Sequence, residues 1–114
     1  MWQGRGEPDR RVDMFGGSGE VRVWSLLSGV LPPFDCVLGC ELDPSGHVGA
    51  HVQDTCTEIV IVTDGHGEAT VSGEPITLRP GVVVSLPLGE ALSLTNHSQT
   101  APLRYLIVKA RGSG

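Results

Sequence analysis

The chain of 114 residues has few aromatic side chains, at 4% of the sequence, and a modest 18% of charged residues. Hydrophobic residues nevertheless reach 39%, which indicates a globular protein rather than a disordered chain. Basic residues are outnumbered, because 8 lysines and arginines stand against 13 aspartates and glutamates, for a net charge of −5. This acidic balance argues against nucleic acids and anionic membrane surfaces as partners.

Long apolar runs and cysteine pairs are also missing. No stretch approaches the roughly 20 apolar residues that cross a bilayer, and the first residues, MWQGRGEPDRR, lack the apolar core of a secretory signal. The three cysteines, Cys36, Cys40 and Cys56, are odd in number and have no CxxC spacing. They fit reduced thiols better than a disulfide framework, so we expect a cytoplasmic protein.

A helical period is absent as well, since no segment repeats its apolar residues at helical spacing over the length of a helix. Instead, short apolar segments alternate with turns rich in Gly, Pro, Asp and Asn. The predicted strands are 21–27, 36–42, 58–62, 68–72, 75–78, 82–86, 91–95 and 103–108, with a further strand around His51. Many short strands separated by frequent turns predict an all-β fold, as a sandwich, a jelly roll or a barrel.

The two ends differ from this β-rich body. Residues 1–19 are rich in Gly, Arg and Asp and are expected to form a flexible N-terminal arm, or an arm that orders on a partner. Met14 and Phe15 are an adjacent apolar pair within it and are candidates for an anchor. Residues 111–114, RGSG, are expected to be a flexible C-terminal end, which leaves 20–110 as one folded domain.

The stretch HVQDTCTE, residues 51–58, concentrates the chemically active side chains. Alternate residues of a strand share a face, so His51 and Gln53 are expected to project together. Glu58 begins the next strand, and a short turn would bring it against them on the inward face. Polar side chains that are buried among apolar ones need partners. A metal ion or a polar ligand is therefore expected beside these three residues.

Two spaced motifs make the body similar to a small single-domain cupin. The first cupin motif is a glycine, His-x-His, a glutamate and a glycine, and its positions here are Gly46, His51, Gln53, Glu58 and Gly65. The second motif is a glycine, Pro-x-Gly, a histidine and an asparagine, and its positions here are Gly81, Pro87, Gly89, Leu92 and Asn96. The resemblance covers about residues 20–109. It implies a cupin-type double-stranded β-helix, that is, a jelly-roll barrel with an internal pocket, often as a homodimer.

In cupins, the motif histidines and the glutamate bind a divalent metal. Carried over position by position, the ligands here would be His51, Gln53, Glu58 and Leu92. Gln53 keeps an oxygen but has no imidazole, and Leu92 has no donor atom. First-row metals are held mainly by imidazole and carboxylate, and catalytic sites usually keep about three strong protein ligands. We therefore expect no firmly bound cofactor, while weak binding of Zn, Fe, Mn or Ni by His51, Gln53 and Glu58 stays open.

Leu92, in place of a histidine, also makes the expected pocket more apolar. The residues predicted to line or underlie it are Val60, Val62, Val84, Leu86, Leu92, Leu94 and Tyr105. A pocket of this kind suits an apolar small molecule. Trp24 and Arg104 are further candidates if they face inward, whereas His66 and His97 lie in predicted turns and are expected to be exposed.

The resemblance extends to bacterial polyketide-cyclase-type cupins. It implies a cyclase or isomerase of natural-product biosynthesis that folds an apolar, oxygenated substrate inside the barrel. His51 would act as general acid or base, Glu58 would orient it, and Gln53 would donate a hydrogen bond to a carbonyl. Two alternatives stay open: a metal-dependent dioxygenase, isomerase or dehydratase, and a non-catalytic small-molecule-binding cupin. We also expect a homodimer that forms through the N-terminal arm.

Overall fold

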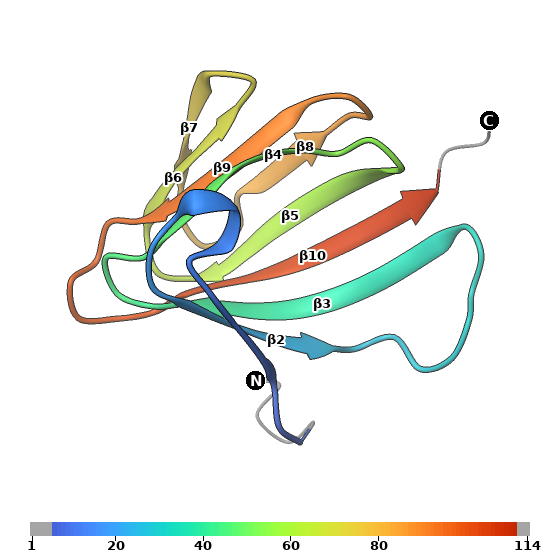
Figure 1. The fold of residues 1–114 in the computed structure, drawn as a ribbon, viewed down its shortest axis with the longest axis horizontal. Helices are drawn as coiled ribbons and strands as arrows, with labels where there is room; N and C mark the ends of the chain where they lie inside the picture. Colours follow the sequence, from blue (N-terminus) through green and yellow to red (C-terminus); the bar gives the residue numbers. More distant parts are fainter. Residues whose placement is uncertain (1–5, 112–114) are drawn as a thin grey trace.

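The computed structural model describes residues 6–111, which form two β-sheets packed face to face (Figure 1). The elements are β1 (Asp9–Val12), the 3-10 helix η2 (Met14–Gly16), β2 (Glu20–Ser25), β3 (Phe34–Leu42), β4 (His47–Val52), β5 (Cys56–Asp64), β6 (Gly67–Val71), β7 (Glu74–Leu78), β8 (Val83–Leu86), β9 (Ala91–Asn96) and β10 (Leu103–Arg111). One sheet has the strand order β1-β2-β3-β10-β5-β8 and the other β4-β9-β6-β7. Every pairing between these strands is antiparallel. This is the jelly-roll barrel that the sequence predicts.

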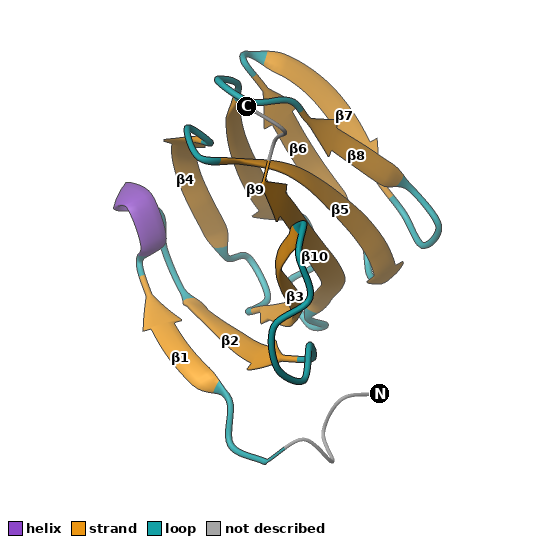
Figure 2. Ribbon diagram, turned by 90° about the vertical axis from the view of Figure 1, so that its right-hand side faces the viewer, coloured by secondary structure: helices purple, strands orange, loops and turns teal. Residues whose placement is uncertain are grey.

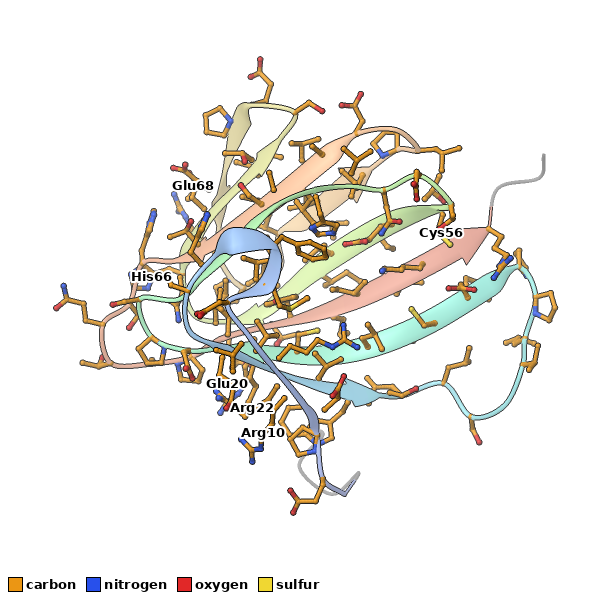
Figure 3. All side chains as sticks on the ribbon, in the orientation of Figure 1. Arg10, Glu20, Arg22, Cys56, His66 and Glu68 are labelled. Atoms are coloured by element: carbon orange, nitrogen blue, oxygen red, sulfur yellow. The ribbon has the colours of Figure 1, made fainter. Side chains whose placement is uncertain are left out.

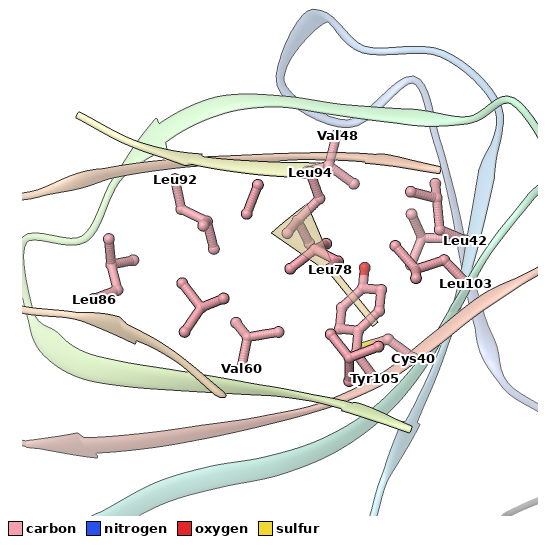
Figure 4. Close-up of a cluster of buried hydrophobic side chains, with 14 of the residues drawn as sticks. Cys40, Leu42, Val48, Val60, Leu78, Leu86, Leu92, Leu94, Leu103 and Tyr105 are labelled. Carbon is pink, nitrogen blue, oxygen red and sulfur yellow. The ribbon is translucent and has the colours of Figure 1, made fainter. Parts of the chain in front are cut away.

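Alternating burial explains why these segments form strands. Leu92 and Leu94 of β9 are buried, and the residues beside them are only partly covered. The same alternation in β5 buries Glu58, Val60 and Val62. Because alternate side chains of a strand point to the same face, both sheets send their apolar sides into one core (Figure 4). Each segment that the sequence predicts as a strand contains one in the structure, although the bounds differ: the strand predicted for 21–27, for example, ends at Ser25.

The N-terminal segment differs from the sequence-based expectation of a flexible arm over residues 1–19. Residues 9–12 form β1, which pairs with β2 at the edge of the six-stranded sheet (Figure 2). Arg10 Nη1 donates a hydrogen bond to Glu20 Oε1 at 2.8 Å, and Met14 packs against the core. The sequence conceals this strand because all four of its side chains are exposed, which leaves no alternation of apolar and polar residues to detect.

The folded domain is therefore longer than the predicted range of 20–110. It begins at Asp9 and includes Arg111, the last residue of β10. Residues 1–5 and 112–114, which belong to the predicted flexible ends, lie outside the described residues. Within residues 6–111, no helix is long and apolar enough to span a membrane.

Candidate functional site

A cavity of about 270 Å³ lies between the two sheets. Most of its wall is apolar, with side chains from β2, β3, β4, β9 and β10 and from η2. The polar side chains in the wall are Arg11, His51, Gln53, Glu58, Tyr105 and Lys109. A concave, mostly apolar space with a few polar groups is the usual form of a small-molecule site. The cavity is therefore the candidate functional site of this barrel.

His51 reaches the cavity because β4 contains a β-bulge. Val48 of β4 is paired with Leu94, and His51 with Leu92, so β4 uses one more residue than β9 over the same distance. In a regular strand, residues three apart point to opposite faces, but an extra residue lets both face the same side. Val48 and His51 accordingly both line the cavity.

The bulge also separates His51 from His47. His47 Nδ1 is 2.8 Å from the hydroxyl oxygen of Thr95, the residue paired with it on β9, and His47 does not line the cavity. In a regular strand His47 and His51, four residues apart, would share a face, so the bulge prevents His47 from joining His51 in the cavity. The strand does begin at His47, but the bulge changes the face on which the later residues lie.

Gln53 and Glu58 meet beside His51, as the sequence predicts. Both side chains are buried, and Gln53 Nε2 donates a hydrogen bond to Glu58 Oε1 at 2.6 Å. The backbone around Gln53 is fixed, because its N–H donates to the carbonyl of Glu90 at 3.0 Å and its carbonyl accepts from the N–H of Gly89 at 2.6 Å. Gln53 is thus anchored to the turn that precedes β9, while its side chain holds one oxygen of Glu58.

Glu58 lies opposite Lys109, its paired residue on β10. Lys109 Nζ is 3.9 Å from Glu58 Oε1, the same oxygen that accepts from Gln53. The lysine side chain remains partly open to solvent, whereas the side chain of Glu58 is only 1% exposed. One oxygen of the carboxylate therefore has two protein partners inside the barrel.

Two polar atoms at this site have no partner among the described residues. His51 Nδ1 and Glu58 Oε2 are buried from solvent and make no hydrogen bond. A buried polar atom without a partner costs about 1–3 kcal/mol, and proteins rarely keep such atoms. Both belong to residues that line the cavity. A molecule bound beside His51 Nδ1 and Glu58 Oε2 would therefore give these two atoms the hydrogen bonds that the protein alone does not supply.

The predicted substrate-binding residues divide into two groups. Leu92, Leu94 and Tyr105 line the cavity. The other four, Val60, Val62, Val84 and Leu86, are not part of its wall. They pack into the hydrophobic core instead, where Val60 of β5 and Val84 of β8 are directly paired. These four aliphatic side chains therefore fill the core next to the site, where Leu86 is paired with Glu58.

The sequence missed several residues of the wall. Arg11, Met14 and Phe15 come from the segment expected to be flexible, and Lys109 comes from the end of β10. Lys109 could have been predicted, because it lies four residues after Tyr105 on the same strand and alternate residues of a strand share a face. Arg11 offered no such signal, since it lies on a strand whose side chains are all exposed.

A model of the cupin domain matches residues 40–109, which is more than half of the chain. This chain belongs to the cupin family. The match includes all of β4, β5 and β9, and therefore the strands that carry His51, Glu58 and Leu92. The family resemblance and the jelly-roll fold expected from the sequence are both confirmed.

Solved structures share the fold of this cupin. A predicted oxalate decarboxylase from Thermotoga maritima is 28% identical, with a TM-score of 0.86 and 93% of each chain covered. A cupin 2 conserved barrel domain protein from Salinispora arenicola is 23% identical, with a TM-score of 0.73 and coverage of 92% of this chain and 83% of that one. KdgF from Halomonas sp. is 16% identical, with a TM-score of 0.69 and coverage of 92% and 88%. No curated protein matches this cupin.

The metal ligands of the family do not fit the side chains of this cupin. The second-motif position is Leu92, and it is paired directly with His51 across β4 and β9, so an apolar side chain stands opposite the imidazole. At the Gln53 position, the amide nitrogen is already bonded to Glu58. Among the described residues, no group of three His, Cys, Asp or Glu side chains could hold a metal ion. With two strong donors at most, the site does not match a firmly bound cupin metal.

Burial determines the protonation of two cavity residues. It raises the pKa of Tyr105 well above its ordinary value, and electrostatic interactions with Cys40 and Glu58 act in the same direction. The hydroxyl of Tyr105 therefore stays protonated and makes no hydrogen bond to any described residue, so it can donate to a bound molecule. Burial also raises the pKa of Cys40 to about 12, which makes its thiol a poor nucleophile.

The other candidates from the sequence lie away from the cavity. Trp24 is buried outside the barrel core, with its indole N–H donating to the carbonyl of Gly6 at 3.0 Å. Arg104 Nε donates to Glu41 Oε2 at 2.6 Å. His66 and His97 are exposed, as expected. Figure 3 shows His66 at the opposite end of β5 from Cys56.

Proposed function

We propose that this cupin binds an apolar, oxygenated small molecule in its cavity and catalyses an acid–base reaction on it, an isomerisation or a cyclisation. The observation that carries the proposal is the pair of buried, unpartnered atoms, His51 Nδ1 and Glu58 Oε2, in a mostly apolar wall. A ligand with a carbonyl or hydroxyl group would provide both with partners. The apolar part of such a ligand would lie against Leu92, Leu94 and Val48.

The chemistry that these two groups support is enolisation. Glu58 Oε2 takes a proton from a carbon next to a carbonyl, the C–H bond breaks, and its electron pair moves through the new C=C bond onto the carbonyl oxygen. His51, with its proton on Nδ1, donates a hydrogen bond to that oxygen as negative charge develops. Return of the proton from Glu58 to another carbon gives an isomer. Alternatively, the enolate carbon attacks a second carbonyl of the same molecule and closes a ring, and the alkoxide formed from that carbonyl takes the proton back from Glu58. Positioned acid–base groups of this kind contribute roughly 10²–10⁴-fold to a rate.

Two neighbours assist in this scheme. Gln53 donates to Glu58 Oε1, so the second carboxylate oxygen remains free to act as the base. Tyr105, with its protonated hydroxyl, is a second donor for an oxygen of the ligand. These roles differ from those expected from the sequence, because Glu58 makes no hydrogen bond to His51 and the amide of Gln53 is directed to Glu58.

The finer assignment to polyketide-like substrates rests on the resemblance to bacterial polyketide-cyclase-type cupins and on the apolar wall. A metal-dependent enzyme is the second candidate. It is favoured by the presence of His51 and Glu58 at two cupin ligand positions and by the name of the 28% identical relative, a predicted oxalate decarboxylase. A non-catalytic binding cupin would use the same cavity without enolising its ligand.

Exchange of α-protons for deuterium tests the proposal without knowledge of the natural substrate. The probe is 2-tetralone, an apolar enolisable ketone, and the exchange rate in D₂O is followed by NMR. We expect the wild-type protein to accelerate exchange, and His51→Gln and Glu58→Gln each to lower the acceleration by about 10²-fold or more. His97→Gln, at an exposed histidine, is the matched control and should retain the full rate.

Other outcomes separate the alternatives. Binding of 2-tetralone without faster exchange would support the non-catalytic cupin. Acceleration that survives both substitutions would show that His51 and Glu58 are not the acid–base groups, and the proposal would be wrong.

A further inference from the structure

The loop that joins β1 to β2, residues 13–19, lies on β4 beside His51, and its residues Met14 and Phe15 line the cavity. We propose that this hairpin loop is part of the active site and that Phe15 is a positioning residue for His51. The inference rests on the proposed function, because Phe15 acts only through the imidazole that the proposed reaction uses. Figure 2 shows η2 of the hairpin loop next to β4.

The hairpin loop is fixed at two places. At its base, the N–H of Asp13 donates to the carbonyl of Gly19 at 3.0 Å, and the N–H of Gly19 donates to Asp13 Oδ1 at 3.2 Å. Further along, Ser18 and His47 exchange both backbone hydrogen bonds, at 2.8 and 2.9 Å. The loop is therefore attached to the first residue of β4, four positions before His51.

Two glycines let the hairpin loop and β4 meet backbone to backbone. A Cβ atom on Gly17 would lie 1.8 Å from the carbonyl oxygen of His47, and a Cβ atom on Gly49 would lie 1.9 Å from the carbonyl oxygen of Phe15. Neither distance is compatible with a side chain. Gly49 also belongs to the β-bulge that turns His51 into the cavity. The same short stretch of β4 thus aims His51 and receives the hairpin loop.

The contact that this arrangement creates is a stack of two rings. The phenyl ring of Phe15 and the imidazole of His51 have centroids 4.2 Å apart and planes inclined by 17°. Phe15 holds this position although its backbone φ of 55° is in the left-handed region, which is unfavourable for such a residue. Phe15 as a whole residue is still 55% exposed, so burial in the core does not account for its position.

The stack matters because no hydrogen bond orients His51. A catalytic histidine usually has one ring nitrogen bonded to a protein group, which fixes the ring and selects the tautomer. Within residues 6–111, the side chain of His51 has no such bond, and its Nδ1 is buried without a partner. Phe15 is the aromatic group that packs on the imidazole, and it restrains the rotation of the ring while leaving Nδ1 free for a ligand.

NMR of the four histidine rings tests this role directly. His51→Gln assigns the His51 signals, and the variants are Phe15→Leu, which removes the ring but keeps apolar volume, and Phe15→Tyr, which keeps the ring. In the wild type we expect a nuclear Overhauser effect between the two rings and His51 ring protons shifted upfield by the phenyl ring. Phe15→Leu should move these protons downfield and slow 2-tetralone exchange at least threefold, while Phe15→Tyr restores both.

The control is Val12→Ala, at an exposed apolar residue of β1 that does not line the cavity, and it should leave both readouts unchanged. Absence of the ring-to-ring Overhauser effect in the wild-type protein would overturn the inference, whatever the stability of Phe15→Leu. Unchanged His51 signals in a folded Phe15→Leu variant would overturn it as well. Either result leaves the proposed function intact, because that proposal stands on the separate loss of exchange in His51→Gln and Glu58→Gln.

Discussion

Glu58 shows at the scale of one residue how this cupin combines stability with chemistry. Its carboxylate is buried and has partners on one oxygen, the amide of Gln53 at 2.6 Å and the ammonium of Lys109 at 3.9 Å. The other oxygen has none among the described residues. An apolar core would avoid this cost, because a buried charge with incomplete partners is usually less favourable than well-packed hydrophobic residues. The site therefore keeps a reactive oxygen at the expense of stability.

A double-mutant cycle on Gln53 and Glu58 measures that cost. Gln53→Leu should lower the free energy of unfolding by about 1–3 kcal/mol, because it leaves a buried carboxylate oxygen without its hydrogen bond. Glu58→Leu leaves the Gln53 amide unpartnered, but Gln53→Leu/Glu58→Leu removes both groups and should be at least as stable as the wild type. Urea denaturation provides the values, with Gln99→Leu at an exposed glutamine as the control. Additive losses in the double variant would mean that the two side chains are not coupled.

The sequence identifies the central site residues but not all that surround them. His51, Gln53, Glu58 and Leu92 are found because motif spacing places them on neighbouring strands. The stack of Phe15 on His51 leaves no trace in the spacing, because it depends on a loop docking through glycines. The direction of the Gln53 amide, toward Glu58 rather than toward a ligand, is likewise a property of the packed side chains.

At the scale of elements, β1, β2, β3 and β10 are joined by a group of charged side chains on the outer side of the six-stranded sheet. Arg22 is its centre, and it donates to Glu20 at 3.0 Å, to Glu41 at 3.2 Å and to Asp43 at 2.9 Å. Arg10, Glu20 and Arg22 lie together beside β2 in Figure 3. These ion pairs hold the hairpin formed by β1 and β2 against β3 and β10.

The charged group gives a prediction for the pH dependence of stability. The hydrogen bond from Arg22, followed by that from the backbone N–H of Glu20, holds the pKa of Asp43 below its ordinary value of 3.8. A lowered folded-state pKa stabilises the protein above the unfolded-state value, and this contribution is lost as the pH falls through the folded-state pKa. Arg22→Met should therefore cost about 1–2 kcal/mol at pH 7, since water partly screens Asp43, and the difference from wild type should shrink below about pH 4.

Urea denaturation at a series of pH values checks this expectation. Arg79→Met is the control, because Arg79 is exposed and lies in the turn before β8, away from the charged group. A difference between Arg22→Met and wild type that stays constant down to pH 2 would show that Asp43 does not depend on Arg22.

Elements with alternating burial are predicted well from this sequence, and the exceptions have a physical cause. The strand β9 alternates buried and partly covered residues throughout, whereas β1 has four exposed side chains and is held by its edge pairing and its ion pairs. The β-bulge in β4 is also hidden, because one extra residue in a short strand changes the inward face without changing the composition. That single shift decides that His51, and not His47, reaches the cavity.

At the scale of the whole molecule, the two sheets enclose one apolar interior that is partly filled by side chains and partly hollow. Val60, Val62, Val84 and Leu86 belong to the filled part, and His51, Gln53 and Glu58 border the cavity. The general fold follows from the sequence, because many short amphipathic strands can bury their apolar faces only by packing sheet on sheet. The position of the hollow does not follow, since it depends on how side-chain volumes fill the space. The homodimer and cytoplasmic location stay predictions.

We propose that this cupin barrel, with two of its four metal positions changed, works through His51 and Glu58 without a metal. The most direct test is the 2-tetralone exchange rate of chelator-treated wild-type protein, before and after addition of Zn²⁺, Mn²⁺, Fe²⁺ or Ni²⁺. Gln53→His/Leu92→His restores the family's ligand set and is the control for metal binding. We expect the chelated wild type to exchange at its full rate and added metal not to raise that rate. Exchange that appears only when metal is added would contradict the proposal.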